Sequence, residues 1–152
     1  MIESQSHVTA DLADQAAVEL AVGRLTTELA RMRAELDESI RLATHDALTG
    51  LPNRRTITER LAEAIERSTS GAVAAMFVDI DRFKVINDLY GHEVGDRVLC
   101  EVAGRLRGAV GAAGEVGRLG GDEFVVVVQG ATGERLSRIA ARVLDCVGPT
   151  VD

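Results

Sequence analysis

The chain has few aromatic residues, few prolines and few cysteines. Aromatic residues make up 3% of the 152 positions and none is tryptophan, so any core must be aliphatic. Cys100 and Cys146 fit no metal or redox spacing, and we expect both to be small core residues in a reducing compartment. The first fourteen residues lack the apolar segment of a signal peptide, and no apolar run approaches the ~18 residues of a membrane span. These absences predict a soluble, cytoplasmic protein without a membrane partner.

Acidic residues outnumber basic ones, 24 to 17. The formal net charge is −7 at pH 7, which argues against a general nucleic-acid or anionic-membrane surface. A mass of 16.2 kDa with 46% hydrophobic residues allows one modest domain and an appendage. Any polyanionic ligand must therefore bind at a local site.

The segment from about residue 12 to residue 43 has no proline and a single glycine, Gly23. Its apolar positions alternate steps of four and three, which is a heptad seam: Val18, Val22, Leu25, Leu29, Met32, Leu36, Ser39 and Ala43. This pattern predicts a parallel dimeric coiled coil over residues 1–44, with Ser39 and Ala43 as weak points. The alternative is a single amphipathic helix that packs on its own domain.

Residues 45–152 show helical and strand periodicities in turn. Asn53 is a candidate N-cap for a helix whose apolar positions, at helical spacing, are Ile57, Leu61, Ala64 and Ile65. We expect Gly111–Gly114 to be a loose loop and Asn87–Gly91 a short helical turn. The last helix should have five residues that face inward: Leu136, Ile139, Ala140, Val143 and Leu144. The main elements should be strand 72–80, helix 93–110, strands 116–119 and 123–129, and helix 133–147. This order predicts an α+β domain with helices on a mainly antiparallel sheet.

Two hydrophobic strands carry carboxylates at their ends. Gly120-Gly121 reads as a tight turn, followed by Asp122-Glu123 and an apolar run that should be buried on both faces. Asp79 and Asp81 close the strand upstream. Paired carboxylates suit Mg²⁺, which takes one or two carboxylates together with substrate phosphates. The alternative is an ordinary hairpin and strand end with solvated acidic residues.

Five motifs in this order resemble the GGDEF domain of diguanylate cyclases, and the resemblance covers the chain from about His45 to its end. They are Asp46–Arg55, Asp79–Lys84, Asn87-Asp88, Gly91-His92 with Gly95-Asp96, and Arg118–Phe124. The resemblance implies a palm-like fold related to class III nucleotide cyclases. It also implies condensation of two GTP into cyclic di-GMP, with release of pyrophosphate.

The resemblance implies a role for each matching residue. Asp79, Asp122 and the Ile80 carbonyl would hold Mg²⁺ or Mn²⁺, and Glu123 would assist as a second metal ligand or a base. Asn87 and Asp96 match the family's guanine readers, although Asn87 can also be a local turn cap. The remaining substrate-binding positions are the backbone N–H groups of Arg82, Phe83 and Lys84 at the phosphates, His92 as a structural residue near the nucleotide, and the turn residues Gly120 and Gly121.

The sequence departs from the family pattern in two places. Many members carry an Arg-x-x-Asp motif that binds product, but here the window is Gly111–Gly114, so we expect weak feedback inhibition. Family domains also continue with further strands and a helix, so the domain at 45–152 is expected to be incomplete. We therefore predict a homodimeric diguanylate cyclase with no sensor domain before its stalk. The rival hypotheses are a non-catalytic GTP- or effector-binding dimerisation module and an inactive fragment.

Overall fold

The computed structural model describes the backbone of residues 3–68, 72–130 and 132–147, and side chains from residue 19 onward. The chain divides into two compact units, Met1–Ala43 and Thr44–Asp152. No helix in the described ranges combines the length and the apolar character needed to cross a membrane.

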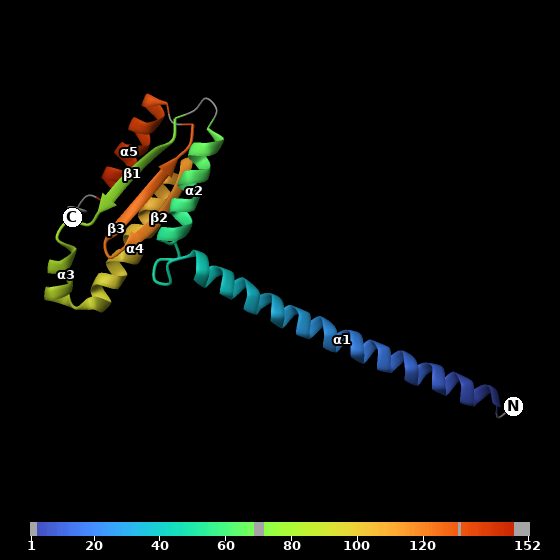
Figure 1. Cartoon of the computed structure of the whole chain (residues 1–152). Helices are drawn as coiled ribbons and strands as arrows, with labels where there is room; N and C mark the ends of the chain where they lie inside the picture. The colour runs from blue at the N-terminus through green and yellow to red at the C-terminus, as the bar shows by residue number, and fades with distance from the viewer. Residues whose placement is uncertain (1–2, 69–71, 131, 148–152) are drawn as a thin grey trace. The chain divides into compact units, whose positions relative to one another are not determined.

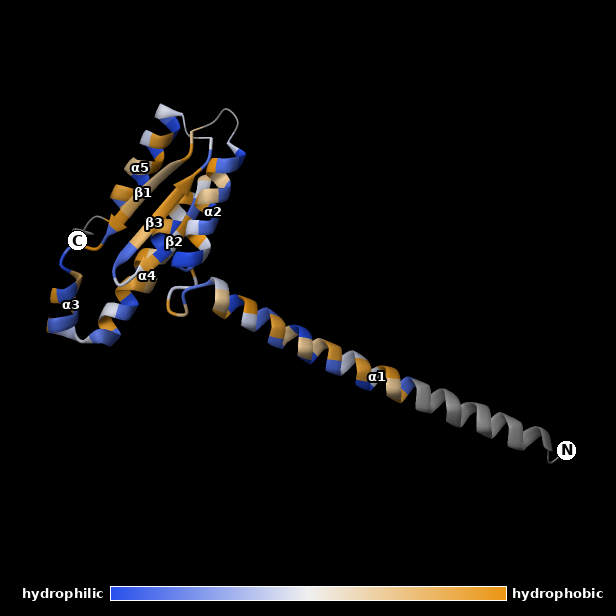
Figure 2. Cartoon of the chain, in the orientation of Figure 1, coloured by the Kyte–Doolittle hydropathy of each residue, from blue (hydrophilic) through white to orange (hydrophobic). Residues whose placement is uncertain are grey.

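The first unit is one helix. α1 runs from Glu3 to Thr44, as the unbroken run of helix-forming residues predicts. Apolar residues recur along its described part (Figure 2), and those of the predicted seam are exposed: Val22 54%, Leu25 66%, Leu29 63%, Met32 50% and Leu36 59%. The side chain of Val18 lies outside the described residues. α1 therefore presents an apolar stripe to solvent in the isolated chain.

The second unit is an α+β domain built on an antiparallel sheet (Figure 1), which confirms the predicted fold class. The order of the described strands across the sheet is β1-β3-β2, so the apolar run after Asp122-Glu123 becomes the central strand. The elements are α2 (Arg54–Arg67), β1 (Ala74–Asp79), α3 (Phe83–Tyr90), α4 (His92–Val110), the 3₁₀ turn η1 (Gly111–Ala113), β2 (Gly114–Gly120), β3 (Glu123–Val128) and α5 (Gly133–Val147).

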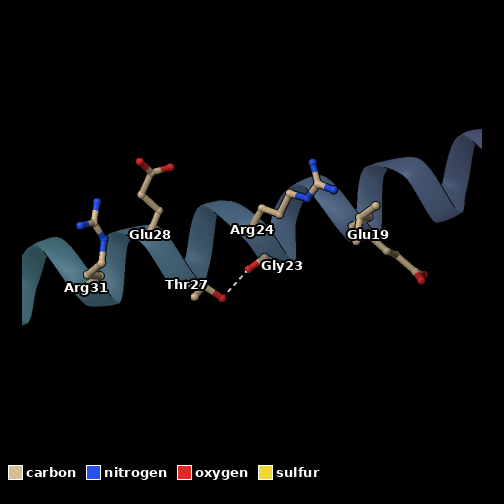
Figure 3. Close-up of a pocket in the computed structure, with 7 residues that line it drawn as sticks. Glu19, Gly23, Arg24, Thr27, Glu28 and Arg31 are labelled. Atoms are coloured by element: carbon tan, nitrogen blue, oxygen red, sulfur yellow. Dashed lines mark hydrogen bonds between the residues drawn. The ribbon is translucent and has the colours of Figure 1, made fainter.

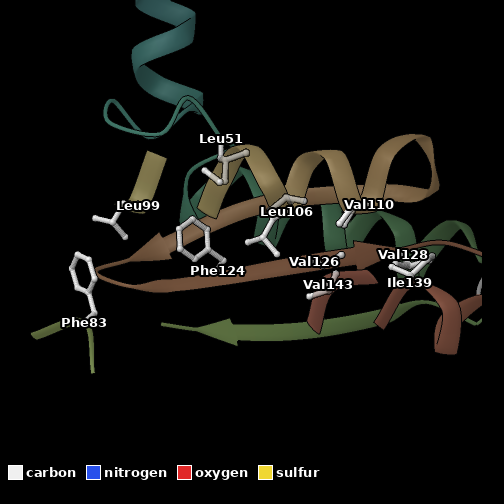
Figure 4. Close-up of a cluster of buried hydrophobic side chains, with 13 residues drawn as sticks. Leu51, Phe83, Leu99, Leu106, Val110, Phe124, Val126, Val128, Ile139 and Val143 are labelled. Atoms are coloured by element: carbon white, nitrogen blue, oxygen red, sulfur yellow. The ribbon is translucent and has the colours of Figure 1, made fainter. Parts of the chain in front are cut away.

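The core lies on both faces of β3, as its sequence predicted. Phe124, Val126 and Val128 are all 0% exposed and belong to the cluster that α4 and α5 complete (Figure 4). Val125 and Val127 point to the opposite face and pack with Ile57 of α2. Successive residues of a strand face opposite sides of the sheet, so one apolar run supplies both layers.

The start of α2 also follows the prediction. Asn53 caps the helix, because its side-chain oxygen accepts a hydrogen bond from the backbone N–H of Thr56 at 3.0 Å. That bond satisfies one of the amide groups that a helix leaves unpaired at its first turn.

Several local predictions were wrong. Leu144 was expected to face inward but is 70% exposed, because helical spacing identifies an apolar face and not how much of that face the neighbouring elements cover. Cys100 is exposed and Cys146 is half-buried, so neither is a fully buried core residue, although both are free thiols. The Gly111–Gly114 window is a 3₁₀ turn that leads into β2, since Gly114 pairs with Val128 in the sheet. The expected turn at Asn87–Gly91 is the end of α3, a helix of 8 residues.

Candidate active site

The two acidic strand ends meet in the sheet. Strands β1 and β3 are antiparallel, and their register places Asp79 directly opposite Glu123. Opposite residues of an antiparallel pair project from the same face, so both side chains lie on one side of the sheet. Asp122 precedes Glu123 in the turn, where Gly120 and Gly121 take φ values of 135° and 55°. Such positive φ values favour glycine, which explains the Gly-Gly pair.

The residues at this strand end suit a hard divalent cation. The described residues contain no group of three His, Cys, Asp or Glu side chains placed to hold a metal ion by themselves. Two neighbouring carboxylates are the donor set that Mg²⁺ accepts when substrate phosphates and water complete its shell. Asp79 and Glu123, which the register sets opposite each other, are donors of this kind, and the metal roles of Asp79, Asp122 and Glu123 stay predictions.

In the segment after β1, one of the three amides predicted to contact phosphates already has a backbone partner. The Phe83 amide donates to the Ile80 carbonyl at 3.1 Å, so both groups are already engaged in the turn that starts α3. That carbonyl has a second lone pair and can still ligate a metal. Among the described residues, Arg82 is the one non-glycine with positive φ, at 56°. Strained backbone of this kind often occurs at ligand sites. The Arg82 and Lys84 side chains are exposed.

The predicted guanine readers come from the consecutive helices α3 and α4. Asn87 is half-buried in α3, and its Oδ1 atom is enclosed with no hydrogen-bond partner. Its carboxamide lies against Gly95, next to Asp96, because a Cβ built on Gly95 would approach Asn87 Oδ1 to 1.9 Å. The structure thus brings Asn87 beside the start of α4. Asp96 and His92 are both exposed there.

Sequence reasoning gave no role to Asp46 and Arg118, which fix the acidic turn. The Arg118 guanidinium donates to both carboxylate oxygens of Asp46, at 2.9 and 3.2 Å. It also donates to the Gly121 carbonyl at 3.0 and 2.7 Å. The backbone N–H and hydroxyl of Thr49 donate to the same Asp46 carboxylate. One arginine therefore ties the loop after α1 to the Gly-Gly turn.

The surroundings of Asp46 shift its acidity. Burial alone would raise the pKa of Asp46, but the hydrogen bonds from Thr49 and Arg118, with the charge of Arg118, lower that pKa below its ordinary value. Asp46 is thus held as a carboxylate. The signal in the sequence was an acid and an arginine inside two of the quoted motifs, but their pairing spans 72 positions.

Arg54 was also missed. This first residue of α2 donates through Nε to the Leu119 carbonyl at 2.7 Å and lies 3.6 Å from the Glu123 carboxylate. Both side chains of the pair are more than half exposed, so the pair is weak in water. Arg54 nevertheless places a positive charge beside the acidic turn.

One surface hollow borders the candidate site, and a second lies on α1. A groove of ≈ 1050 Å³ runs beside β1 and α5, with mostly apolar walls, and shares Asp79–Arg82 with the candidate site but not Asn87 or Asp96. A second hollow of ≈ 530 Å³ lies on α1 alone, around Gly23 (Figure 3). At 3.6 residues per turn its lining is opposite the Leu25–Leu36 seam. One helix supplies all its walls, so it is not an enclosed site.

Comparisons with known proteins agree with the motifs. A family profile described as "Diguanylate cyclase, GGDEF domain" matches residues 43–149. The chain is 48% identical over 107 residues to the bifunctional diguanylate cyclase/cyclic di-GMP phosphodiesterase MucR of Pseudomonas aeruginosa, covering 69% of this chain and 15% of MucR. It is 46% identical over 114 residues to the response regulator PleD of Caulobacter vibrioides, covering 74% of this chain and 25% of PleD. The chain thus spans a quarter or less of these curated relatives.

A solved structure is similar as well. The crystal structure of the coiled coil and GGDEF domain of DgcB from Caulobacter crescentus, in complex with c-di-GMP, superposes with a TM-score of 0.73. The two sequences are 27% identical, and the match covers 84% of this chain and 69% of that one.

Proposed function

This chain belongs to the GGDEF domain family of diguanylate cyclases, and from that premise we propose that it condenses two GTP into cyclic di-GMP and releases pyrophosphate. The observation that most supports the proposal is the register of Asp79 with Glu123, beside Asp122 in the Gly-Gly turn. Acid pairs at strand ends can be incidental. Here Asp122 and Glu123 directly follow the Gly-Gly turn, whose Gly121 carbonyl accepts a hydrogen bond from Arg118.

The reaction consists of two in-line attacks: in each, the ribose 3′-hydroxyl of one GTP attacks the α-phosphate of the other, and one pyrophosphate leaves. Asp79, Asp122 and the Ile80 carbonyl would hold Mg²⁺ or Mn²⁺, and Glu123 would assist as a further ligand or as a base. The ion would stabilise charge on the phosphate oxygens and lower the pKa of the hydroxyl. The amides of Arg82 and Lys84 would contact the phosphates at the start of α3.

Base selection falls to Asn87 and Asp96. A carboxamide that donates to guanine O6 and N7 and a carboxylate that accepts from N1–H and the 2-amino group complement a guanine edge. Adenine offers a donor where guanine has O6, so a site built this way rejects ATP. His92 and the Gly120–Gly121 turn would line the nucleotide without reacting.

Two copies are needed, because each binds one GTP and each hydroxyl must reach the other's phosphate. We assign residues 1–44 to a dimerising stalk and residues 45–152 to the catalytic domain. The exposed seam of α1 supports a two-stranded coiled coil, since each large aliphatic side chain gains roughly 1.5–3 kcal/mol when fully buried. Pairing then raises the effective concentration of one domain near the other.

The test is nucleotide turnover. The chain is incubated with GTP and Mg²⁺, and cyclic di-GMP and pyrophosphate are quantified. Asp122→Asn should lower turnover by more than about 100-fold while the thermal unfolding curve stays unchanged, because loss of outer-shell groups alone costs a metal site that much. Asp145→Asn, which removes the same charge from an exposed position of α5, is the matched control.

Three outcomes separate the hypotheses. Wild-type turnover in Asp122→Asn would refute the metal assignment. GTP binding without product in the parent chain would favour the non-catalytic regulatory module. Failure of the parent to bind GTP at all would overturn the proposal for this polypeptide.

A further inference from the structure

Gly95 is a buried glycine of α4. Because it has no side chain, there is room beside it for Asn87, a residue that the proposed function uses. A Cβ on Gly95 would come within 1.9 Å of Asn87 Oδ1, 3.0 Å of Asn87 Cγ and 3.2 Å of Phe83 Cζ. The first distance is far shorter than any van der Waals contact, so the carboxamide would have to move. Phe83 needs to yield only by a few tenths of an ångström.

The orientation of the Asn87 carboxamide decides which hydrogen-bonding group it can offer to a ligand. Its Oδ1 atom is turned inward to Gly95 and is enclosed without a hydrogen-bond partner. With the oxygen enclosed, the amino group is the remaining polar end of the carboxamide. An amino group donates and cannot accept, so it complements guanine O6 and repels the amino group that adenine carries at the same place.

The enclosed oxygen also has an energetic consequence. A buried acceptor without a partner costs free energy, and a carboxamide that could rotate freely would turn this oxygen to solvent. The oxygen lies in the space that Gly95 leaves between α3 and α4.

We propose that Gly95 is a specificity-positioning residue: the space left by its absent side chain seats the Asn87 carboxamide and so sets the preference for guanine over adenine. The proposal rests on the proposed function, because it assumes that Asn87 meets the base of GTP. Gly95 does not contact the reacting atoms. It acts through Asn87.

The experiment is a double-mutant cycle on the full chain with Gly95→Ala, Asn87→Ala and the double variant. Dissociation constants for GTP and ATP are measured with Mg²⁺ under non-turnover conditions, and thermal unfolding is recorded for each variant. Gly104→Ala is the matched control, since Gly104 lies in the same helix and a Cβ there meets nothing within 4 Å.

Gly95→Ala should weaken GTP binding about tenfold, the value of one buried hydrogen bond, and reduce the GTP-over-ATP preference, whereas Gly104→Ala should change neither. In the Asn87→Ala background, Gly95→Ala should have no further effect on the preference, because the group it displaces is gone. Unchanged nucleotide preference in Gly95→Ala, or an equal effect in both backgrounds, would overturn the proposal.

Stability supplies a second readout that keeps the proposal testable if Gly95→Ala folds poorly. The clash is mainly with the Asn87 side chain, so Asn87→Ala should restore the unfolding temperature that Gly95→Ala loses. Absence of this rescue would show that Gly95 serves the backbone packing of α4 and not the seat of Asn87. If the parent chain shows no preference for GTP over ATP, the proposed function is refuted. The unfolding temperatures of the variants would still show whether Gly95 makes room for the Asn87 side chain.

Discussion

The apolar side chains of α1 and of the folded unit have opposite surroundings. Leu25 and Leu29 of α1 are 66% and 63% exposed, while Phe124 and Val126 of β3 are 0% exposed. The folded unit buries these apolar residues within one chain, because helices cover both faces of β3. A lone helix has no second layer, so nothing within α1 itself covers its apolar stripe.

The folded unit also has exposed large apolar residues. Phe77 of β1 and Leu144 of α5 are 76% and 70% exposed, and both line the groove beside β1. Strand β1 is at the edge of the described sheet, whereas β3 is at its centre. The described residues therefore expose large apolar side chains on α1 and at the β1 edge, and also on α2 and α3, where Ile65, Leu89 and Tyr90 are 58%, 68% and 67% exposed.

The strongest way to break this comparison is to charge the α1 seam. Leu29→Glu would place two like charges across a dry interface and should give monomers by light scattering. Monomers should still bind GTP, but cyclic di-GMP synthesis at low protein concentration should fall by roughly 100-fold or more, the gain that tethering usually provides. Activity should partly return as the protein concentration rises.

The control for this experiment is Thr27→Glu, which adds the same charge to the opposite side of α1 and should leave the oligomeric state unchanged. A monomeric parent chain would refute the coiled coil. A Leu29→Glu variant that is monomeric yet fully active when dilute would refute the link between stalk pairing and catalysis.

Truncating one apolar side chain in each unit tests whether the folded unit is stable by itself. Phe124→Ala should lower the free energy of unfolding of the folded unit by about 3–5 kcal/mol, because the cavity adds to the lost transfer free energy. Leu25→Ala should leave that transition in place and only weaken association. Denaturant unfolding followed by circular dichroism at several protein concentrations distinguishes the two. A Phe124→Ala loss that depends on concentration would mean that the domain core is not self-sufficient.

The sequence predicted the features that depend on local pattern. The Gly-Gly turn, the buried run after it, the Asn53 cap and the bounds of α5 all follow from spacing or turn chemistry over a few residues. Short or glycine-rich segments were misjudged, because α3 and the start of β2 owe their structure to neighbours. Gly114, for example, is extended since it pairs with Val128.

The candidate site shows the same division. Its acidic residues could be picked from the sequence, but the register that sets Asp79 against Glu123 depends on the pairing of strands far apart in the chain. The pairing of Arg118 with Asp46 spans 72 positions and has no local signature. The role of Gly95 appears only when α3 and α4 are packed together. The metal and nucleotide roles of these residues stay predictions.

One ion pair in each unit can also be compared, and here the expected change in stability is the smallest. Arg118 and Asp46 are 11% and 24% exposed, whereas Arg31 and Glu35 of α1 are 66% and 64% exposed. Asp46→Asn should destabilise the domain by about 1–3 kcal/mol at neutral pH, the usual value of hydrogen bonds to a charged group. Glu35→Gln, its match on α1, should cost at most about 0.5 kcal/mol, because water screens an exposed pair.

The pH dependence gives the sign of the Asp46 contribution. Folding lowers the pKa of Asp46, so the unfolded chain takes up a proton at a higher pH than the folded chain does. The stability difference between the parent and Asp46→Asn should therefore be constant above the ordinary aspartate pKa of about 3.9 and shrink as the pH falls below it. Urea unfolding of both proteins between neutral pH and pH ~3 measures this difference. A difference that instead widens on acidification would show that burial, and not the bonds from Arg118 and Thr49, controls this carboxylate.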